Sequence, residues 1–237
     1  MPNKLIIVTG GSKGIGRAII EKFASQGFDI ATTSRNEADL LALKIEIEKK
    51  HPNTNVFFKK ADLSKKHEVE AFAQYILALN RNIDVLVNNS GVYLPGQVHN
   101  EPEGQLEYLI EANVYSAYYL TRALLPAMVK SKSGHIFTIC STASITAYVN
   151  GGSYCISKFA LYGMTKVLRE EMKPLGVKVT AILPGATKTA SWDGVDLPEE
   201  RFMKASDVAE TVFGAYSLSP SAVVEELVMR PQEGDIG

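Results

Sequence analysis

Several features that would point to other classes of protein are scarce in this sequence. Only two cysteines, Cys140 and Cys155, occur in 237 residues, so neither a disulfide framework nor a cysteine-based zinc site is expected, and both thiols are predicted to be reduced and buried. The four histidines are scattered, and no metal site is predicted. No apolar run approaches the roughly 20 residues of a membrane-spanning helix. An apolar stretch begins at Leu5, which leaves no room for a signal peptide, and we expect a cytoplasmic protein that binds no membrane.

An excess of charge of one sign is also missing. Lys and Arg number 25 and Asp and Glu number 26, which gives a net charge of -1. A protein that binds nucleic acid mainly by its overall charge would be strongly positive, so nucleic acid is not an expected partner. Hydrophobic residues make up 46% of the chain and charged residues 22%, which is typical of a globular protein.

Short apolar segments alternate with longer amphipathic segments along the chain. The apolar segments are predicted to be strands and the amphipathic ones helices. The strands are expected at 5–9, 29–34, 56–60, 85–88, 134–140, 177–183 and 223–229, and the helices at 14–26, 37–50, 66–79, 105–130 and 155–173. This alternation predicts an α/β fold in one domain over residues 1–237, a Rossmann-type doubly wound parallel sheet with helices on both faces.

The segment 187–204 differs from the rest because it has no clear periodicity. It contains the only tryptophan, Trp192, and it follows the strand expected at 177–183. A long loop after the carboxyl end of a strand often covers the substrate in an α/β protein, so 187–204 is predicted to be a substrate-binding loop. The alternative is a surface loop in which Trp192 packs on the core.

A glycine-rich turn follows the first expected strand and precedes the first expected helix. Glycine permits positive φ and lets a pyrophosphate approach the backbone closely, while the helix N-terminus offers free N–H groups and a favourable dipole. The turn therefore predicts a dinucleotide cofactor, and a tight turn without a ligand is the alternative. Its residues are Thr9, Gly10, Gly11, Ser12, Lys13, Gly14, Ile15 and Gly16.

The residues after the second expected strand favour NADP(H) over NAD(H). An NAD site usually has an acidic residue here that bonds the adenosine 2′-hydroxyl group. This chain has Ser34 and Arg35 instead, with Lys13 in the glycine-rich turn. A guanidinium and an ammonium attract a 2′-phosphate, whereas a carboxylate would repel it. The alternative is that both cations are ordinary solvated charges.

A tyrosine and a lysine stand four residues apart in the helix expected around 155–173. This spacing puts Tyr154 and Lys158 on one helix face, where the ammonium is expected to lower the tyrosine pKa from its usual value of about 10. Tyr154 then exchanges a proton with a carbonyl oxygen during hydride transfer. Ser141 closes the strand expected at 134–140, where its hydroxyl can bond the same oxygen. Asn113 is a poor helix former inside an expected helix, and a solvent-facing asparagine is the alternative explanation.

In combination and order, these motifs resemble those of the short-chain dehydrogenase/reductase family over nearly the whole chain. The resemblance implies that Tyr154 is the acid/base and that Lys158 binds the nicotinamide ribose and lowers the tyrosine pKa. It further implies that Ser141 orients the substrate oxygen and that Asn113 holds a water in a proton relay. Ser90 stands where the family motif Asn-Asn-Ala-Gly has alanine, and the added hydroxyl is expected to be tolerated.

The same resemblance assigns cofactor binding to residues in four motifs. These are the glycine-rich turn with the position after the second strand, the segment 61–63, the segment 88–91 and the segment 184–189. The cofactor residues expected on this basis are Gly10, Ser12, Lys13, Gly14, Ile15, Gly16, Arg35, Asp62, Leu63, Asn89, Ser90, Gly91, Tyr154, Lys158, Pro184, Gly185, Thr187 and Thr189.

The resemblance implies an NADP(H)-dependent oxidoreductase that reduces a ketone, dicarbonyl or aldehyde to an alcohol, or runs the reverse. A mostly apolar pocket mouth is expected from Tyr93, Ile145, Tyr148 and Trp192, which favours a neutral small-molecule substrate. One alternative is a 3-oxoacyl-(acyl-carrier-protein) reductase, although the C-terminal residues 223–232 lack the glycine-rich ending that many of these reductases share. A catalytically silent NADP(H)-sensing regulator is the non-enzyme alternative, and it would not need the serine, tyrosine and lysine.

Relatives in this family often assemble through the two long helices, here expected at 105–130 and 155–173. The first of these is apolar around much of its circumference, and a helix that is apolar on more than one face is buried on more than one side. We therefore expect a homodimer or homotetramer.

Overall fold

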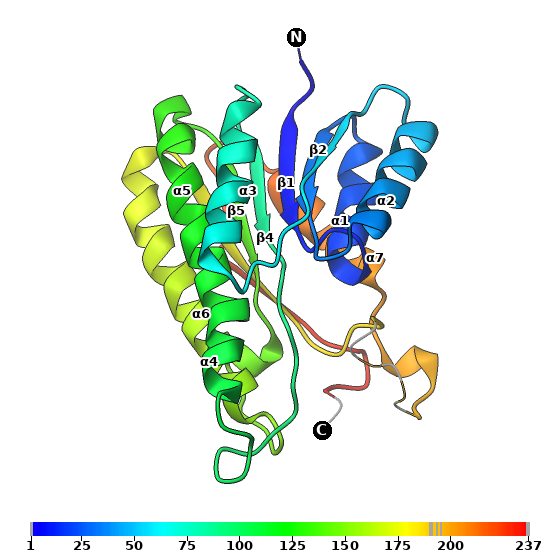
Figure 1. Ribbon diagram of the computed structural model, residues 1–237, viewed down its shortest axis with the longest axis vertical. Coiled ribbons are helices and arrows are strands. Elements are labelled where there is room, and N and C mark those ends of the chain that lie inside the picture. Colours follow the sequence, from blue (N-terminus) through cyan, green and yellow to red (C-terminus); the bar gives the residue numbers. More distant parts are fainter. Residues whose placement is uncertain (1, 190–191, 193, 195, 236–237) are drawn as a thin grey trace.

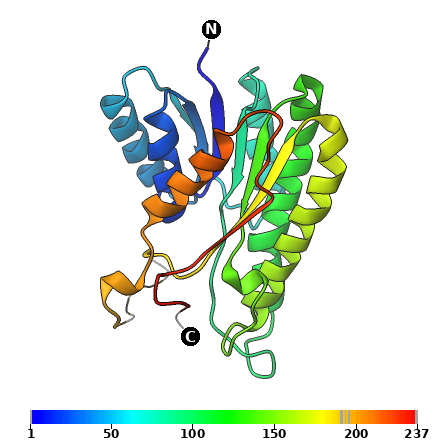
Figure 2. The ribbon, with the colours of Figure 1, turned by 180° about the vertical axis from the view of Figure 1, so that it is seen from behind.

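A computed structural model describes residues 2–189, 192, 194 and 196–235. Seven parallel strands form one sheet in the spatial order β3-β2-β1-β4-β5-β6-β7 (Figures 1 and 2). The order reverses between β1 and β4, which is where a doubly wound sheet opens a crevice at its carboxyl edge. The predicted Rossmann-type fold is confirmed. The strands are β1 (Leu5–Thr9), β2 (Asp29–Thr33), β3 (Val56–Phe58), β4 (Val85–Asn88), β5 (His135–Ile139), β6 (Lys178–Pro184) and β7 (Glu226–Met229).

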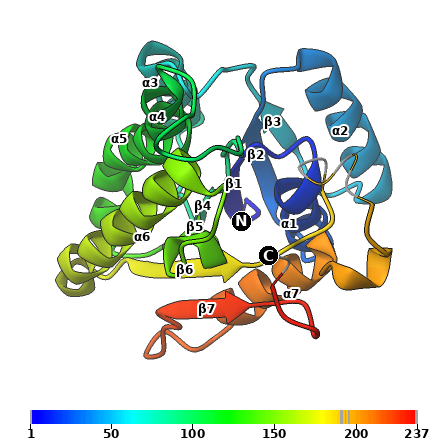
Figure 3. The ribbon, with the colours of Figure 1, turned by 90° about the horizontal axis from the view of Figure 1, so that it is seen from below.

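Helices cover both faces of the sheet, as Figure 3 shows in a view onto the carboxyl ends of the strands. The apolar sides of α1, α2 and α7 pack on one face, and those of α3, α5 and α6 pack on the other. No helix in the described part of the chain is long and apolar enough to cross a membrane. The helices are α1 (Gly14–Ala24), α2 (Glu37–Lys50), α3 (Lys66–Ala78), α4 (Gln105–Ile110), α5 (Ser116–Ser131), α6 (Gly152–Met172) and α7 (Ala205–Tyr216).

Three helical segments differ from the sequence prediction. The helix expected at 105–130 is divided into α4 and α5 by a π-helical turn, Glu111–Tyr115. Helix α6 begins at Gly152 rather than at residue 155, so Tyr154 lies in its first turn. Helix α7 was not predicted at all, although its buried residues Val208 and Val212 complete the face that α1 covers.

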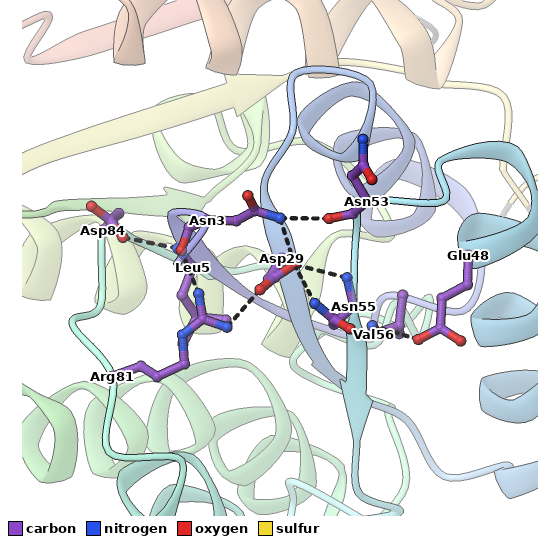
Figure 4. Close-up of polar contacts among 9 residues, drawn as sticks. All are labelled: Asn3, Leu5, Asp29, Glu48, Asn53, Asn55, Val56, Arg81 and Asp84. Atoms are coloured by element: carbon purple, nitrogen blue, oxygen red, sulfur yellow. Dashed lines mark hydrogen bonds and ion pairs between the residues drawn. The ribbon is translucent and has the colours of Figure 1, made fainter. Parts of the chain in front are cut away.

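The amino edge of the sheet is held by a network of polar contacts (Figure 4). The carboxylate of Asp29, at the start of β2, is only 3% exposed and accepts hydrogen bonds from the side chain of Asn3, from the main chain and side chain of Asn55, and from Arg81. Nearby, the Asp84 carboxylate accepts the N–H of Leu5 at 2.8 Å. These bonds tie the beginnings of β1, β2, β3 and β4 together, while the functional candidates gather at the opposite edge.

Candidate active site

The glycine-rich turn joins β1 to α1 at the carboxyl edge of the sheet. Gly10 and Gly14 have φ angles of 65° and 57°, which L side chains rarely adopt. A Cβ atom at Gly16 would lie 2.5 Å from Asn89 Nδ2 and 2.5 Å from the carbonyl oxygen of Gly10, so no side chain fits there. The Asn89 amide donates to the carbonyl of Thr9 at 2.8 Å. The glycines thus allow the turn to close against the end of β4, with the N-terminus of α1 facing outward.

The hydroxyl of Thr9 fastens the ends of β1 and β4 to each other. It accepts hydrogen bonds from the main-chain N–H groups of Asn89 and Ser90, both at 2.9 Å. A Cβ atom at Gly10 would come within 3.0 Å of the Ser90 hydroxyl, so the serine packs directly against the turn. The crevice at the reversal of strand order is therefore built by side chains and backbone from both strands.

A cleft of about 490 Å³ opens along this crevice, a volume within the range of ligand pockets. Its size and the two positive-φ glycines fit an extended dinucleotide. Most of the predicted cofactor residues line it, namely Gly10, Ser12, Lys13, Gly14, Ile15, Arg35, Asp62, Leu63, Asn89, Ser90, Gly91 and Thr189. Residues that the sequence analysis did not select also line it: Thr33, Asn36, Asp39, Ser64, Val92, Tyr108 and Ala112.

The other predicted cofactor residues lie outside the lining of this cleft. Gly16 does not line the cleft, but its lack of a side chain leaves the space that the Asn89 amide occupies. Pro184 ends β6, and Gly185 donates its N–H to the carbonyl of Met229 at 2.8 Å. Thr187 is 4% exposed and donates its hydroxyl to Gly185 at 3.0 Å. Tyr154 and Lys158 lie farther along the carboxyl edge, on α6.

Asp62 and Arg35 face each other at one end of the cleft. Although partial burial works against its charge, Asp62 has a pKa below its usual value, because Ser64 donates two hydrogen bonds to it and Arg35 and Lys65 lie nearby. The carboxylate is thus charged at neutral pH and can accept a further hydrogen bond. Arg35 is exposed at the mouth of the cleft.

Lys13, expected to attract a phosphate, already has an anionic partner. Its ammonium lies 3.0 Å from the carboxylate of Asp39, and both residues line the cleft. Asp39 belongs to the first turn of α2, whose N-cap residue Asn36 accepts hydrogen bonds from the N–H groups of Ala38 and Asp39. The positive charge at this end of the cleft is therefore smaller than the sequence suggested.

Tyr154 and Lys158 lie on one face of α6, but the expected lowering of the tyrosine pKa is wrong for this structure. Burial raises the pKa of Tyr154 to about 12, and the neighbouring hydroxyl of Ser141 opposes only part of that rise. The Lys158 ammonium donates to the carbonyl of Ile139 at 3.1 Å and lies 5.9 Å from the centre of the tyrosine ring. Burial also lowers the pKa of Lys158 itself, and Lys158 is not among the groups that shift the pKa of Tyr154.

Asn113 lies within the π-helical turn and is completely buried, so the alternative of a solvent-facing asparagine is wrong. Its amide accepts the N–H of Val92 at 2.7 Å and donates to the Val92 carbonyl at 3.0 Å and to the Ser157 hydroxyl at 2.9 Å. A Cβ atom at Gly91 would lie 3.2 Å from Asn113 Oδ1 and 3.6 Å from Lys158 Nζ. Asn113 and Lys158 therefore converge on the same short segment after β4.

Ser141 lies two residues beyond β5, at the start of the 3-10 turn Thr142–Ser144. Its hydroxyl oxygen accepts the N–H of Ala143 at 3.1 Å, while its own N–H donates to the hydroxyl of Ser144 at 3.2 Å. The bond from Ala143 uses only the oxygen of the Ser141 side chain, so the hydroxyl hydrogen stays available to an acceptor.

Two of the predicted substrate residues flank Tyr154. The rings of Tyr93 and Tyr154 pack edge to face, with centres 4.9 Å apart. Burial raises the pKa of Tyr148, and Tyr154 and Tyr93 are close enough to add to the rise. Ile145 is 41% exposed. Trp192 packs against Phe202, with the ring centres 5.1 Å apart.

Comparison with known proteins now gives the family. The model of the family described as short chain dehydrogenase matches residues 4–199, which is most of the chain. The chain belongs to the short-chain dehydrogenase family. The resemblance to this family that the sequence predicted is thereby confirmed.

Three similar proteins show how far the likeness extends. A sepiapterin reductase of Chlorobaculum tepidum is 34% identical over 240 residues, covering 98% of this short-chain dehydrogenase and 98% of the relative. A diacetyl reductase of Staphylococcus epidermidis is 33% identical over 218 residues, covering 91% and 83%. Among solved structures, an alcohol dehydrogenase from Thermococcus sibiricus complexed with 5-hydroxy-NADP has a TM-score of 0.90 at 26% identity, covering 99% of both chains.

Sequence reasoning missed two residues that this short-chain dehydrogenase places at the site. Asp39 was not selected because acidic residues are common in the first turn of a helix. Its pairing with Lys13, which is distant in sequence, has no local sequence signal. Glu101 escaped because it lies in the segment between an expected strand and helix, where charge is commonplace. Its carboxylate accepts hydrogen bonds from Ser153, next to Tyr154.

Proposed function

We propose that this chain is an NADP(H)-dependent oxidoreductase that interconverts a carbonyl group and an alcohol, with Tyr154 as the acid/base. The observation that carries the proposal is the convergence of Asn113, Ser141, Tyr154 and Lys158 at the carboxyl edge, beside a cleft of dinucleotide size. Family membership and three reductase or dehydrogenase relatives support this class of reaction.

The chemistry divides between the cofactor and the chain. NADPH, when bound, supplies the hydride that the carbonyl carbon accepts. The carbonyl oxygen takes the proton of the Tyr154 hydroxyl, so C=O becomes CH–OH, and in the reverse direction Tyr154 accepts that proton. Ser141 donates its free hydroxyl hydrogen to the same oxygen and fixes its direction. Lys158, which converges with Asn113 on the segment at Gly91, would donate hydrogen bonds to the ribose next to the reacting ring.

The preference for NADP(H) rests on cations at the open end of the cleft. Arg35 is exposed there, and Lys13 lines the same region although it pairs with Asp39. Asp62, with its depressed pKa, is suited to accept a hydrogen bond from the adenine amino group. The relative from Thermococcus sibiricus is complexed with an NADP derivative, which agrees with this proposal.

The substrate that suits the mouth is a neutral carbonyl compound of modest size. Tyr93 and Tyr148 flank Tyr154 with aromatic surface, and Ile145, which is 41% exposed, is proposed to add aliphatic surface to the mouth. The segment 187–204, of which residues 190, 191, 193 and 195 lie outside the described part of the chain, is proposed to be the substrate-binding loop, and its Trp192 packs on Phe202. Relatives named for reducing sepiapterin and diacetyl are consistent with ketone or dicarbonyl substrates.

A homodimer or homotetramer is proposed on the surface of α5 and α6. Five large apolar side chains, four on these helices and one at the end of the π-helical turn before α5, are at least 41% exposed, and a stable monomer rarely leaves such a group uncovered. A light-scattering mass equal to one chain across micromolar concentrations would contradict this. The side chains are Tyr115, Tyr118, Ile156, Phe159 and Val167.

The test is the oxidation of NADPH by the purified protein against a panel of carbonyl compounds, with NADH in parallel. The panel contains small diketones, aromatic ketones, aldehydes and an acetoacetyl thioester. Turnover of diketones or aromatic ketones with NADPH supports the proposal, and a strong preference for the thioester makes the chain a 3-oxoacyl reductase instead. Binding of NADPH without turnover of any compound favours the regulatory alternative.

A further inference from the structure

A carboxylate outside the predicted site holds the first turn of the helix that carries Tyr154. Glu101, in the loop between β4 and α4, accepts a hydrogen bond from the Ser153 hydroxyl and another from the Ser153 N–H at 3.3 Å. It also accepts one from the side chain of Gln105, the first residue of α4, at 2.8 Å. We call Glu101, Gln105 and Ser153 the Glu101 clasp, because they join the starts of α4 and α6.

Two glycines allow this clasp to close. A Cβ atom at Gly96 would lie 2.8 Å from the Glu101 carboxylate and 2.6 Å from the Gln105 amide. A Cβ atom at Gly152 would lie 2.6 Å from the carbonyl oxygen of Gly96 and 2.9 Å from the same carboxylate. Backbone and carboxylate therefore occupy the space that any side chain would need at these positions.

The loops on both sides of the clasp are paired as well. Gly96 forms an isolated parallel β-bridge with Gly151, and its N–H donates to the carbonyl of Asn150 at 3.0 Å. The side chain of Gln97 donates to the Asn150 side chain at 2.7 Å. The loop that carries Tyr93 is thereby attached to the segment that leads into α6.

The start of α6 needs this outside partner. Its N-cap residue is Gly151, which has no side chain to accept the free N–H groups of the first turn. Ser153 is 1% exposed, so its N–H and hydroxyl are shielded from water, and Glu101 accepts both. A carboxylate is also favoured at this end of the helix dipole.

We propose that Glu101 is a positioning residue: by capping α6 from the opposite loop, it sets the direction of the Tyr154 hydroxyl and holds Tyr93 against that ring. This inference rests on the proposed function of Tyr154. Tyr154 follows Ser153 directly, and the edge-to-face contact of Tyr93 with Tyr154 spans the same two segments that the clasp joins. A hydroxyl that turns away by about 1 Å loses on the order of 100-fold in rate.

The experiment compares four variants of the full chain. Glu101→Ala removes the cap, whereas Glu101→Gln keeps one oxygen that can accept from Ser153. Gly152→Ala pushes the two segments apart without changing charge. Glu103→Ala is the matched control, since Glu103 is exposed in the same loop and loses the same charge. Turnover is measured per NADPH-binding site, well below the melting temperature of each variant, so loss of folded protein does not enter the rate.

The expected pattern separates positioning from simple stabilisation. Glu101→Ala and Gly152→Ala lower the per-site rate roughly 10- to 100-fold with little change in the Kd for NADPH, while Glu101→Gln recovers most of the rate and Glu103→Ala matches the parent. If Glu101→Ala lowers only the melting temperature and keeps the parent per-site rate, Glu101 merely stabilises the fold and the proposal is wrong.

A second readout keeps the inference testable if the parent protein turns over none of the carbonyl compounds, a result that would count against the proposed function alone. Amide hydrogen exchange at Ser153 and Tyr154, together with the nuclear Overhauser contact between the rings of Tyr93 and Tyr154, reports the geometry directly. Loss of protection and of the ring contact in Glu101→Ala, but not in Glu103→Ala, supports the clasp. Unchanged protection and contact in Glu101→Ala overturn it.

Discussion

The polar side chains at the two edges of the sheet differ in how many hydrogen-bond partners they have. At the amino edge, the buried carboxylate of Asp29 is surrounded by donors from Asn3, Asn55 and Arg81. At the carboxyl edge, Lys158 is buried and Tyr154 is half-buried, both with fewer partners, and desolvation moves both of their pKa values away from the charged form. The polar groups at the amino edge hold the strands together, whereas those at the carboxyl edge keep hydrogen-bonding capacity that the protein itself does not use.

The two edges are therefore expected to contribute differently to the free energy of unfolding. A buried charge surrounded by donors stabilises the fold, whereas a buried hydroxyl or ammonium with spare bonding capacity reduces stability until something binds it. The same edge contains the positive-φ glycines Gly10 and Gly14, which also cost conformational entropy. Substitutions at the two edges should therefore affect different quantities.

The largest effect is expected from Tyr154→Phe at the carboxyl edge. Removing the hydroxyl removes the proton donor, so turnover should fall by about 10²- to 10⁴-fold while NADPH binding changes little. The free energy of unfolding should stay equal or rise, because a hydroxyl buried with few partners is lost. Tyr115→Phe, at the exposed last residue of the π-helical turn, is the control. Turnover retained in Tyr154→Phe would contradict the acid/base role.

The matching change at the amino edge is Asp29→Ala. It leaves the Arg81 guanidinium and the Asn55 N–H without their buried acceptor, so the free energy of unfolding should fall by roughly 3–5 kcal/mol. Turnover per folded molecule should match that of the parent. Urea unfolding measures the loss, and Glu70→Gln, in an exposed pair 3.7 Å from Lys66, should change stability by about 0.5 kcal/mol or less. Equal losses in the two variants would show that the Asp29 network is not special.

Much of the fold and part of the site were predictable from local sequence signals. Alternating periodicity gave the strands and most helices, and the glycine-rich turn gave the position of the cleft because its residues are adjacent in sequence. Helix α7 lies between the irregular segment 187–204 and the strand expected at 223–229, where the sequence analysis predicts no element. The apolar residues of α7 form a buried face only because they pack against α1, and this contact is not visible in the sequence.

The parts that sequence could not supply are contacts between distant segments. Lys158 was expected to lower the tyrosine pKa from its spacing alone, yet burial and its bond to the Ile139 carbonyl decide the outcome. Asn113 looked like a weak helix residue, and its π-helical turn and its bonds to Val92 and Ser157 give the reason. These pKa values and hydrogen bonds depend on how deeply each side chain is buried and on its distance from other polar groups. A local sequence pattern contains neither quantity.

The dependence of the free energy of unfolding on pH tests a second buried group at the amino edge, His135, which is the first residue of β5. Burial lowers its pKa to about 3, and Nδ1 has no hydrogen-bond partner among the described residues. The unfolded chain binds a proton near pH 6.5 and the folded chain does not, so the free energy of unfolding should fall as the pH drops from 6.5 towards 3. The slope is at most about 1.4 kcal/mol per pH unit.

His135→Gln tests this source of acid sensitivity. Glutamine does not titrate and can still donate to the hydroxyl of Thr180, as His135 does at 2.7 Å, so the slope between pH 6.5 and 4.5 should flatten. Below pH 4 the depressed pKa of Asp29 adds its own loss, which His135→Gln should leave in place. His67→Gln, at an exposed position, should keep the parent slope. An unchanged slope in His135→Gln would show that other groups carry the titration.

The smallest effect is expected at the far end of the cleft, where Asp39 is paired with Lys13 at 3.0 Å. The carboxylate repels a 2′-phosphate and occupies the ammonium that would bind it, so Asp39→Asn should tighten NADPH binding by about 2- to 5-fold and leave NADH nearly unchanged. Glu37→Gln removes the same charge from the same helix turn, outside the lining of the cleft, and should change both cofactors equally. The gain should shrink at high salt, because the groups are partly exposed. Equal changes for NADPH and NADH in Asp39→Asn would make Asp39 an ordinary helix-terminal charge and return the cofactor preference to Arg35 alone.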